Sequence, residues 1–147
     1  MLQTEELTNV DIANINAPTQ IVISGLVPDM QRAVDQLQKL RKARVILLQV
    51  NGPLHSRYLQ SVAEKFADYV KTINFASAKI PVIANVTAKP YGVEQTADLL
   101  IAQIVKPVQW EASINYFLVN GVQEFIEIGP GQVSTNLVKR IRRHFNK

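Results

Sequence analysis

Apolar residues recur along the chain with two different spacings, and each spacing predicts one kind of element. β-Branched residues predict strands at residues 10–15 and 20–24, which the turn-forming residues between them would pair antiparallel. Apolar residues three and four positions apart predict amphipathic helices, the first of them opened by Pro28 and Asp29. The helices are expected at residues 28–40, 59–73, 93–105, 107–120 and 132–143. Short apolar runs predict further strands at residues 44–49, 80–83 and 124–128.

The order of these elements predicts an α/β fold in two units. The strand–turn–strand–helix–strand order of residues 10–49 is typical of a ferredoxin-like subdomain whose first strand and helix are absent. Residues 50–147 alternate strands with helices, which is typical of part of a parallel α/β sheet. Because a sheet without its edge strand leaves backbone groups unpaired, the pattern also indicates a truncated sheet. We therefore predict a partial ferredoxin-like subdomain at residues 10–49, followed by part of an α/β core at residues 50–147.

Composition supports a folded protein and excludes several classes. Hydrophobic residues make up 47% of the 147 residues and charged residues 19%, as in a globular domain. No apolar run is long enough to cross a bilayer, and the acidic start of residues 1–6 is not typical of a secretory signal. The absence of cysteine excludes disulfides, thiolate metal sites and cysteine nucleophiles, and it fits a cytoplasmic protein with no membrane role.

Positive charge is concentrated near the end of the chain. The formal net charge is +4, and residues 139–144 read KRIRRH. Such a run is either the solvated face of a terminal helix, which we favour, or a surface for phosphates, nucleic acid or an acidic protein partner. Nucleic acid is the weakest of these, because the predicted strands show no exposed aromatic platform.

The chain has only two histidines, so each can be considered separately. His55 follows a predicted strand and precedes a helix, which is where α/β folds usually present reactive groups. An imidazole there could transfer a proton to or from a nucleophile, or it could be a hydrogen-bonded structural residue. His144 lies among arginines and is expected on the surface. Two distant histidines without cysteine predict no metal site.

No serine in the chain has the context of an acyl-transfer nucleophile. Such a serine normally sits on a Gly-x-Ser-x-Gly elbow, and none of the serines has glycines on both sides: Ser24, Ser56, Ser61, Ser77, Ser113 and Ser134. Ser56 is instead predicted to cap the following helix. The turn Gly129-Pro130-Gly131 could mimic a phosphate cradle, but it lacks a full phosphate-binding signature, and a structural turn is favoured.

Several segments in one order resemble the malonyl-CoA:acyl-carrier-protein transacylase family and related acyltransferase domains. The matching segments are residues 13–25 (ANINAPTQIVISG), 51–56 (NGPLHS), 80–87 (IPVIANVT), 103–110 (QIVKPVQW) and 125–133 (FIEIGPGQV), which leads into 137–141 (LVKRI). The resemblance implies that residues 50–147 form the C-terminal part of an α/β-hydrolase-like acyltransferase core.

The resemblance also implies a chemistry. A serine attacks malonyl-CoA, and acyl carrier protein then takes the malonyl group, in a ping-pong transfer that serves fatty acid biosynthesis without a cofactor. His55 occupies the position of the family's catalytic histidine, and Gln103 matches the residue whose backbone carbonyl orients that imidazole. Asn14 and Asn16 correspond to residues near the substrate cleft. Leu54 replaces the phenylalanine common in malonyl-selective members, which weakens the prediction of strict malonyl selectivity.

Three parts of the family site lie upstream of the segments that match. These are the serine elbow, the arginine that pairs with the malonyl carboxylate, and the glutamine of the oxyanion hole. The chain is therefore expected to supply the histidine and to be inactive without a serine-bearing N-terminal partner. The alternative is a non-catalytic module that holds acyl carrier protein through Arg140, Arg142 and Arg143.

Overall fold

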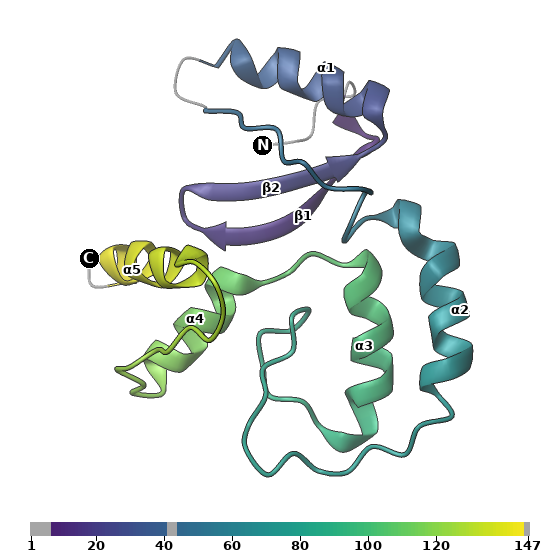
Figure 1. The fold of residues 1–147 in the computed structure, drawn as a ribbon, viewed down its shortest axis with the longest axis vertical. Helices are drawn as coiled ribbons and strands as arrows, with labels where there is room; N and C mark the ends of the chain where they lie inside the picture. Colours follow the sequence, from purple (N-terminus) through teal and green to yellow (C-terminus); the bar gives the residue numbers. More distant parts are fainter. Residues whose placement is uncertain (1–6, 41–43, 146–147) are drawn as a thin grey trace.

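The computed structural model describes residues 7–40 and 44–145, so the predictions that concern residues 1–6 lie outside the described range. The described residues form a two-stranded sheet, five α-helices and two short 3-10 helices. In chain order they are β1 (Val10–Ala17), β2 (Gln20–Gly25), α1 (Val27–Gln38), η2 (Arg57–Leu59), α2 (Gln60–Val70), η3 (Val93–Gln95), α3 (Thr96–Val105), α4 (Trp110–Val119) and α5 (Val133–Phe145). Figure 1 shows the β hairpin and α1 above, α2 and α3 side by side below, and α4 and α5 on the opposite side from α2.

The predicted hairpin and first helix are confirmed. β1 pairs antiparallel with β2, from Val10 opposite Gly25 to Ala17 opposite Gln20. Proline lies at the start of α1 and Asp29 in its first turn, where a carboxylate interacts favourably with the helix dipole. Ala33 of α1 is fully buried against Leu7 and Val10. One face of the hairpin is thereby covered by the helix that follows it.

The other edge of β1 joins the hairpin to the rest of the chain. The amide of Ile15 donates to the carbonyl of Val108 at 2.9 Å, and the amide of Val108 donates to the carbonyl of Ala13 at 2.8 Å. These bonds make a parallel bridge between Asn14 and Val108. Because residues 107–109 are held extended by this pairing, the fourth helix begins at Trp110 and not at Pro107, as the sequence predicted.

The three further predicted strands are wrong in the described structure. Residues 44–49, 80–83 and 124–128 form no regular element and belong to no sheet, apart from one bridge between Ile83 and Pro90. A strand needs a hydrogen-bonded neighbour, and the only sheet among the described residues is the hairpin. The apolar side chains of these segments are consequently exposed: Leu47 is 74% exposed, Ile80 76% and Ile128 96%. The ferredoxin-like unit accordingly has two strands in place of three.

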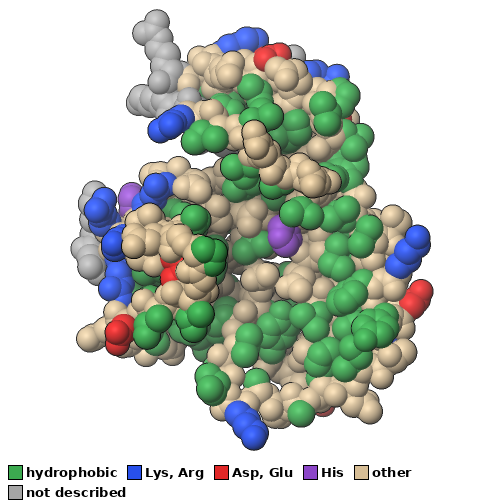
Figure 2. Space-filling view, in the orientation of Figure 1, with side chains coloured by type: hydrophobic (Ala, Val, Ile, Leu, Met, Phe, Trp, Pro, Cys, Tyr) green, Lys and Arg blue, Asp and Glu red, His purple; other side chains and the backbone are tan. Residues whose placement is uncertain are grey.

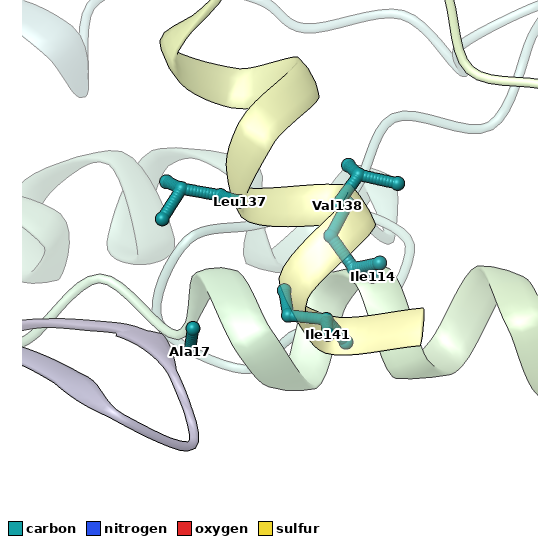
Figure 3. Packing of buried hydrophobic residues seen from close by; sticks show 5 residues of the cluster. All are labelled: Ala17, Ile114, Leu137, Val138 and Ile141. Atoms are coloured by element: carbon teal, nitrogen blue, oxygen red, sulfur yellow. The ribbon is translucent and has the colours of Figure 1, made fainter. Parts of the chain in front are cut away.

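The main core lies where β1, α4 and α5 meet. One buried cluster, drawn in Figure 3, consists of Ala17, Ile114, Leu137, Val138 and Ile141. Ile141 is 1% exposed. The helix α4 ends at Asn120 and Gly121, as predicted, with Gly121 in the left-handed conformation (φ 82°). Within the described ranges no helix is long and apolar enough to span a bilayer.

Candidate active site

His55 lies in a tight loop with an unusual backbone. Its φ is 55°, a left-handed value that costs a non-glycine residue about 1–3 kcal/mol and persists only when its surroundings impose it. Upstream, the amide of Leu54 donates to the carbonyl of Gly52 at 2.9 Å. Downstream, the hydroxyl of the fully buried Ser56 donates to the carbonyl of Pro53 at 2.5 Å. Ser56 therefore fixes the loop and makes no side-chain cap bond to the next helix, contrary to the sequence prediction.

The imidazole of His55 is oriented by a backbone carbonyl. Its Nδ1 lies 2.7 Å from the carbonyl oxygen of Gln103 on α3. Because a carbonyl can only accept, Nδ1 carries the proton and Nε2 of the neutral ring keeps a lone pair. The ring is partly exposed. Such a ring can take a proton at Nε2 from an approaching hydroxyl and return it later.

Gln103 is itself held by the segment that precedes α3. Its side-chain oxygen accepts from Nδ2 of Asn85 at 3.2 Å, and the carbonyl of Asn85 accepts from the amide of Gln109 at 2.8 Å. Gln109 follows Val108, which pairs with β1. A continuous series of hydrogen bonds therefore connects the histidine with the hairpin.

A second connection between the hairpin and the histidine loop was not predicted. Both carboxylate oxygens of Asp11 on β1 accept from Arg57, whose Nε lies 2.9 and 3.0 Å away and whose Nη2 is also bonded. The amide of Arg57 donates to the same carboxylate at 2.8 Å. The side-chain hydrogen bonds from Arg57 hold the pKa of Asp11 below its usual value, and the same bonds raise the pKa of Arg57. Asp11 and Arg57 are 46 residues apart in the chain, and no sequence pattern predicts that they pair.

The remaining predicted site residues fall into two groups. Asn14 and Asn16 are partly exposed on β1, and Leu54 is 52% exposed beside His55. The three arginines are on α5, at a distance from the histidine loop (Figure 1). Two of them contact their own chain. Arg140 donates to Gln20 at 2.8 Å, and Arg142 donates to the carbonyl of Gln123 and stacks on a ring of the main core, Phe125, at 5.1 Å.

The glycine-rich turn before α5 serves a structural purpose. The carboxylate of Glu127 accepts from the amides of Ser134 and Thr135, at 3.0 and 2.9 Å, and from the Thr135 hydroxyl at 2.7 Å. These bonds, chiefly those from Thr135, lower the pKa of Glu127 to about 2. The helix amides that a phosphate would need are therefore occupied by this carboxylate.

Two other features of the described residues are separate from His55. An open cavity of about 220 Å³ lies beside α3, lined among others by Val82, Tyr91 and Leu100, and burial there raises the pKa of Tyr91. No group of three acidic, histidine or cysteine side chains within residues 7–40 and 44–145 is arranged to hold a metal ion.

The fold matches the C-terminal part of an acyltransferase fold. No family model matches the sequence. By sequence and fold, the chain corresponds to the C-terminal portion of the malonyl CoA-acyl carrier protein transacylase family.

Individual relatives support this correspondence. The chain is 41% identical over 143 residues to the polyketide biosynthesis malonyl CoA-acyl carrier protein transacylase PksC of Bacillus subtilis, covering 97% of this chain and 50% of PksC. A malonyl transacylase structure from Streptococcus pneumoniae superimposes with a TM-score of 0.87 at 38% identity, over 94% of this chain and 45% of that one. A malonyl-transacylase solved in complex with a type II polyketide synthase acyl-carrier protein gives a TM-score of 0.87 at 33% identity, over 91% and 44%. The chain spans about half the length of the curated relatives it matches.

Proposed function

We propose that this chain supplies the general base and acid for transfer of a malonyl group from malonyl-CoA to acyl carrier protein. The observation that carries the proposal is the 2.7 Å contact between His55 Nδ1 and the carbonyl of Gln103, which leaves Nε2 free to accept a proton. The names of the relatives support the substrates, since they are malonyl CoA-acyl carrier protein transacylases. One imidazole serves both halves of the reaction, first as the base and then as the acid.

In the first half, Nε2 of His55 takes the proton of a serine hydroxyl while the serine oxygen attacks the thioester carbon of malonyl-CoA. The tetrahedral intermediate collapses, the carbon–sulfur bond breaks, and the imidazolium returns the proton to the departing CoA sulfur. In the second half, His55 takes the proton of the carrier protein's pantetheine thiol, whose sulfur attacks the malonyl ester. The serine oxygen leaves and regains the proton. The transfer needs no cofactor.

We infer that the nucleophilic serine of this scheme lies outside the described residues, since none of the six serines has a Gly-x-Ser-x-Gly context. Ser56 is fully buried and Ser113 is 8% exposed, and both hydroxyls donate to backbone carbonyls. Ser24 is 9% exposed within β2. We infer that a serine-bearing half of the acyltransferase provides the nucleophile, together with the arginine and the oxyanion glutamine that the family resemblance implies.

The surface of the chain favours such a partner. The three segments at residues 44–49, 80–83 and 124–128 expose apolar side chains and belong to no sheet among the described residues. Figure 2 shows hydrophobic side chains spread over the lower part of the face, where α2 and α3 lie. Unpaired apolar strands are templates for pairing with other strands. A half-enzyme that brings parallel strands to these segments would bury them and place its serine beside His55.

Reconstitution tests the proposal directly. The chain is incubated with malonyl-CoA alone, and with malonyl-CoA plus the serine-bearing N-terminal half of a relative such as PksC, and both mixtures are analysed by intact mass spectrometry. We expect malonylation of the added half only when both polypeptides are present. The His55→Ala variant should abolish that malonylation. Absence of malonylation in both mixtures would reject the proposal, as would full malonylation with the His55→Ala variant.

A second candidate is a non-catalytic module that binds acyl carrier protein through α5. Lys139 and Arg143 are exposed one turn apart on this helix, and Figure 2 shows Lys and Arg side chains gathered on that side of the molecule. An acidic partner would be attracted to such a surface. This candidate requires neither a serine nor His55, so the two can be separated by experiment.

A further inference from the structure

The backbone of His55 is held in place from one side by a residue of the hairpin. The φ of 55° is a strained value for histidine, and such strain is maintained only by fixed neighbours. Two local hydrogen bonds fix the loop around His55: the amide of Leu54 donates to the carbonyl of Gly52, and the hydroxyl of Ser56 donates to the carbonyl of Pro53. Downstream, the first long-range attachment is at Arg57, two residues further on.

Asp11 binds both the backbone and the side chain of Arg57. The carboxylate of Asp11 accepts from the Arg57 backbone amide and, in a two-pronged contact, from its guanidinium. A planar guanidinium that meets a carboxylate in this way fixes direction as well as distance. Asp11 is itself mostly buried, with 18% of its side chain exposed. Next to it, the hydroxyl of Tyr58 donates to the carbonyl of Asn9 at 2.7 Å.

The local bonds of the loop and the Asp11 contact at Arg57 together restrict where the side chain of His55 can point. The imidazole must remain within hydrogen-bonding reach of Gln103 for Nε2 to face a nucleophile, and a displacement of about 1 Å at a catalytic group can cost about a hundredfold in rate. Two of the three guanidinium nitrogens of Arg57, Nε and Nη2, are engaged by Asp11.

We propose that Asp11 is a positioning residue for His55: through Arg57 it anchors the histidine loop to β1 and keeps the imidazole on the Gln103 carbonyl. This inference rests on the proposed role of His55, but its primary test does not require activity. His55 and His144 are the two histidines of the chain, so an imidazole ¹H–¹⁵N spectrum contains two rings. His144 bonds within α5, to the carbonyl of Arg140 at 3.0 Å, and serves as the internal reference.

The test compares Asp11→Asn with a control, Asp35→Asn. Asp35 is exposed, and its carboxylate accepts from Gln31 within α1 at 3.1 Å. In Asp11→Asn we expect the His55 Nδ1 signal to move towards that of a ring exchanging between tautomers, with the His144 signals unchanged. Asp35→Asn should leave both rings unchanged. An unmoved His55 signal in Asp11→Asn would overturn the proposal, and so would an equal shift in the control.

A second pair of variants covers the case in which Asp11→Asn does not fold. Arg57→Lys keeps the charge but loses the two-pronged contact, and it should move the His55 signal in the same direction. Asp11→Glu retains a carboxylate and should restore part of the original signal. If Arg57→Lys leaves His55 unmoved, the proposal fails.

Kinetics provide an independent readout in the completed enzyme. We expect Arg57→Lys and Asp11→Asn to lower kcat about 10- to 100-fold while the KM for malonyl-CoA stays nearly constant, because the ring is displaced and substrate binding is not. An effect on KM alone would contradict a positioning role. If the reconstituted enzyme shows no transfer at all, the proposed function fails, while the spectra still decide the role of Asp11.

Discussion

At the scale of single residues, the site depends on how one imidazole is oriented. The family resemblance implied that Gln103 would act through its carbonyl, and the structure places that oxygen 2.7 Å from Nδ1 of His55. The catalytic roles of both residues remain predictions. Sequence could point to the two residues because each lies in a short motif. It could not indicate the left-handed φ of His55 or its attachment to Asp11, since both depend on contacts between segments far apart in the chain.

A backbone partner leads to a specific prediction for Gln103. Replacing its side chain by alanine keeps the carbonyl that accepts from His55 and removes only the bond from Asn85. In the reconstituted enzyme we expect Gln103→Ala to lower kcat by less than about tenfold, since a neutral hydrogen bond contributes about 0.5–1.5 kcal/mol. His55→Ala should remove the activity. Equal losses in the two variants, measured as steady-state transfer rates, would contradict action through the carbonyl.

At the scale of elements, α5 is fixed by one carboxylate at its start and by apolar residues along one face. Glu127 takes up two of the amides at the N-terminal end, and the helix packs Leu137, Val138 and Ile141 into the main core. The helix itself could be anticipated, because apolar spacing predicted it at residues 132–143. The contribution of Glu127 could not, since the partner of a helix N-terminus depends on how the preceding turn folds back.

The Glu127 contact predicts a pH-dependent stability. Its pKa is about 2 in the folded chain, below the ordinary value of 4.5, so its stabilisation is present above pH 4.5 and is lost as pH falls towards 2. Glu127→Gln should therefore unfold at a lower temperature than the parent at pH 7, with the difference shrinking between pH 5 and 2. The exposed Glu124 supplies the control, Glu124→Gln, for which thermal unfolding should show no such trend. A difference that stays constant down to pH 2 would contradict the assignment.

The face of α5 gives a second prediction at this scale. Ile141 is 1% exposed in the main core, whereas Val133 at the start of the same helix is 71% exposed. Ile141→Ala should reduce the free energy of unfolding by about 2–5 kcal/mol through lost burial and a residual cavity. Val133→Ala should change it by less than about 0.5 kcal/mol. Denaturant titrations of the two variants provide the comparison, and similar values for both would show that α5 does not pack as described.

At the scale of the whole molecule, the main difference between sequence and structure concerns strands. The hairpin was predicted correctly because its two strands are adjacent in sequence and supply each other's hydrogen bonds. Residues 44–49, 80–83 and 124–128 have strand-like apolar composition, but they find no sheet partner among the described residues, so their apolar side chains remain exposed. Local composition indicates what a segment could form. Pairing decides what it does form.

Charge distribution over the molecule leads to a prediction about acyl carrier protein. If α5 is the contact surface, Lys139→Glu with Arg143→Glu should weaken binding about 2- to 30-fold, from two surface charge pairs of about 0.2–1 kcal/mol each. These two residues are preferable to Arg140 and Arg142, whose guanidiniums hold Gln20 and Gln123. Lys65→Glu on α2 with Lys71→Glu just after its end, both exposed, changes the net charge equally and should have little effect. Equal weakening in calorimetric titrations would attribute binding to net charge and reject the α5 surface.

The strand β1 is hydrogen-bonded along both edges, to β2 on one side and to Val108 on the other. A strand shared in this way cannot act as a hinge, since any rotation of the hairpin would break the bonds of Ile15 and Val108 together. The hairpin and residues 107–109 therefore form one cooperative unit. In hydrogen exchange, the protected amides of this unit should therefore share a common free energy of opening.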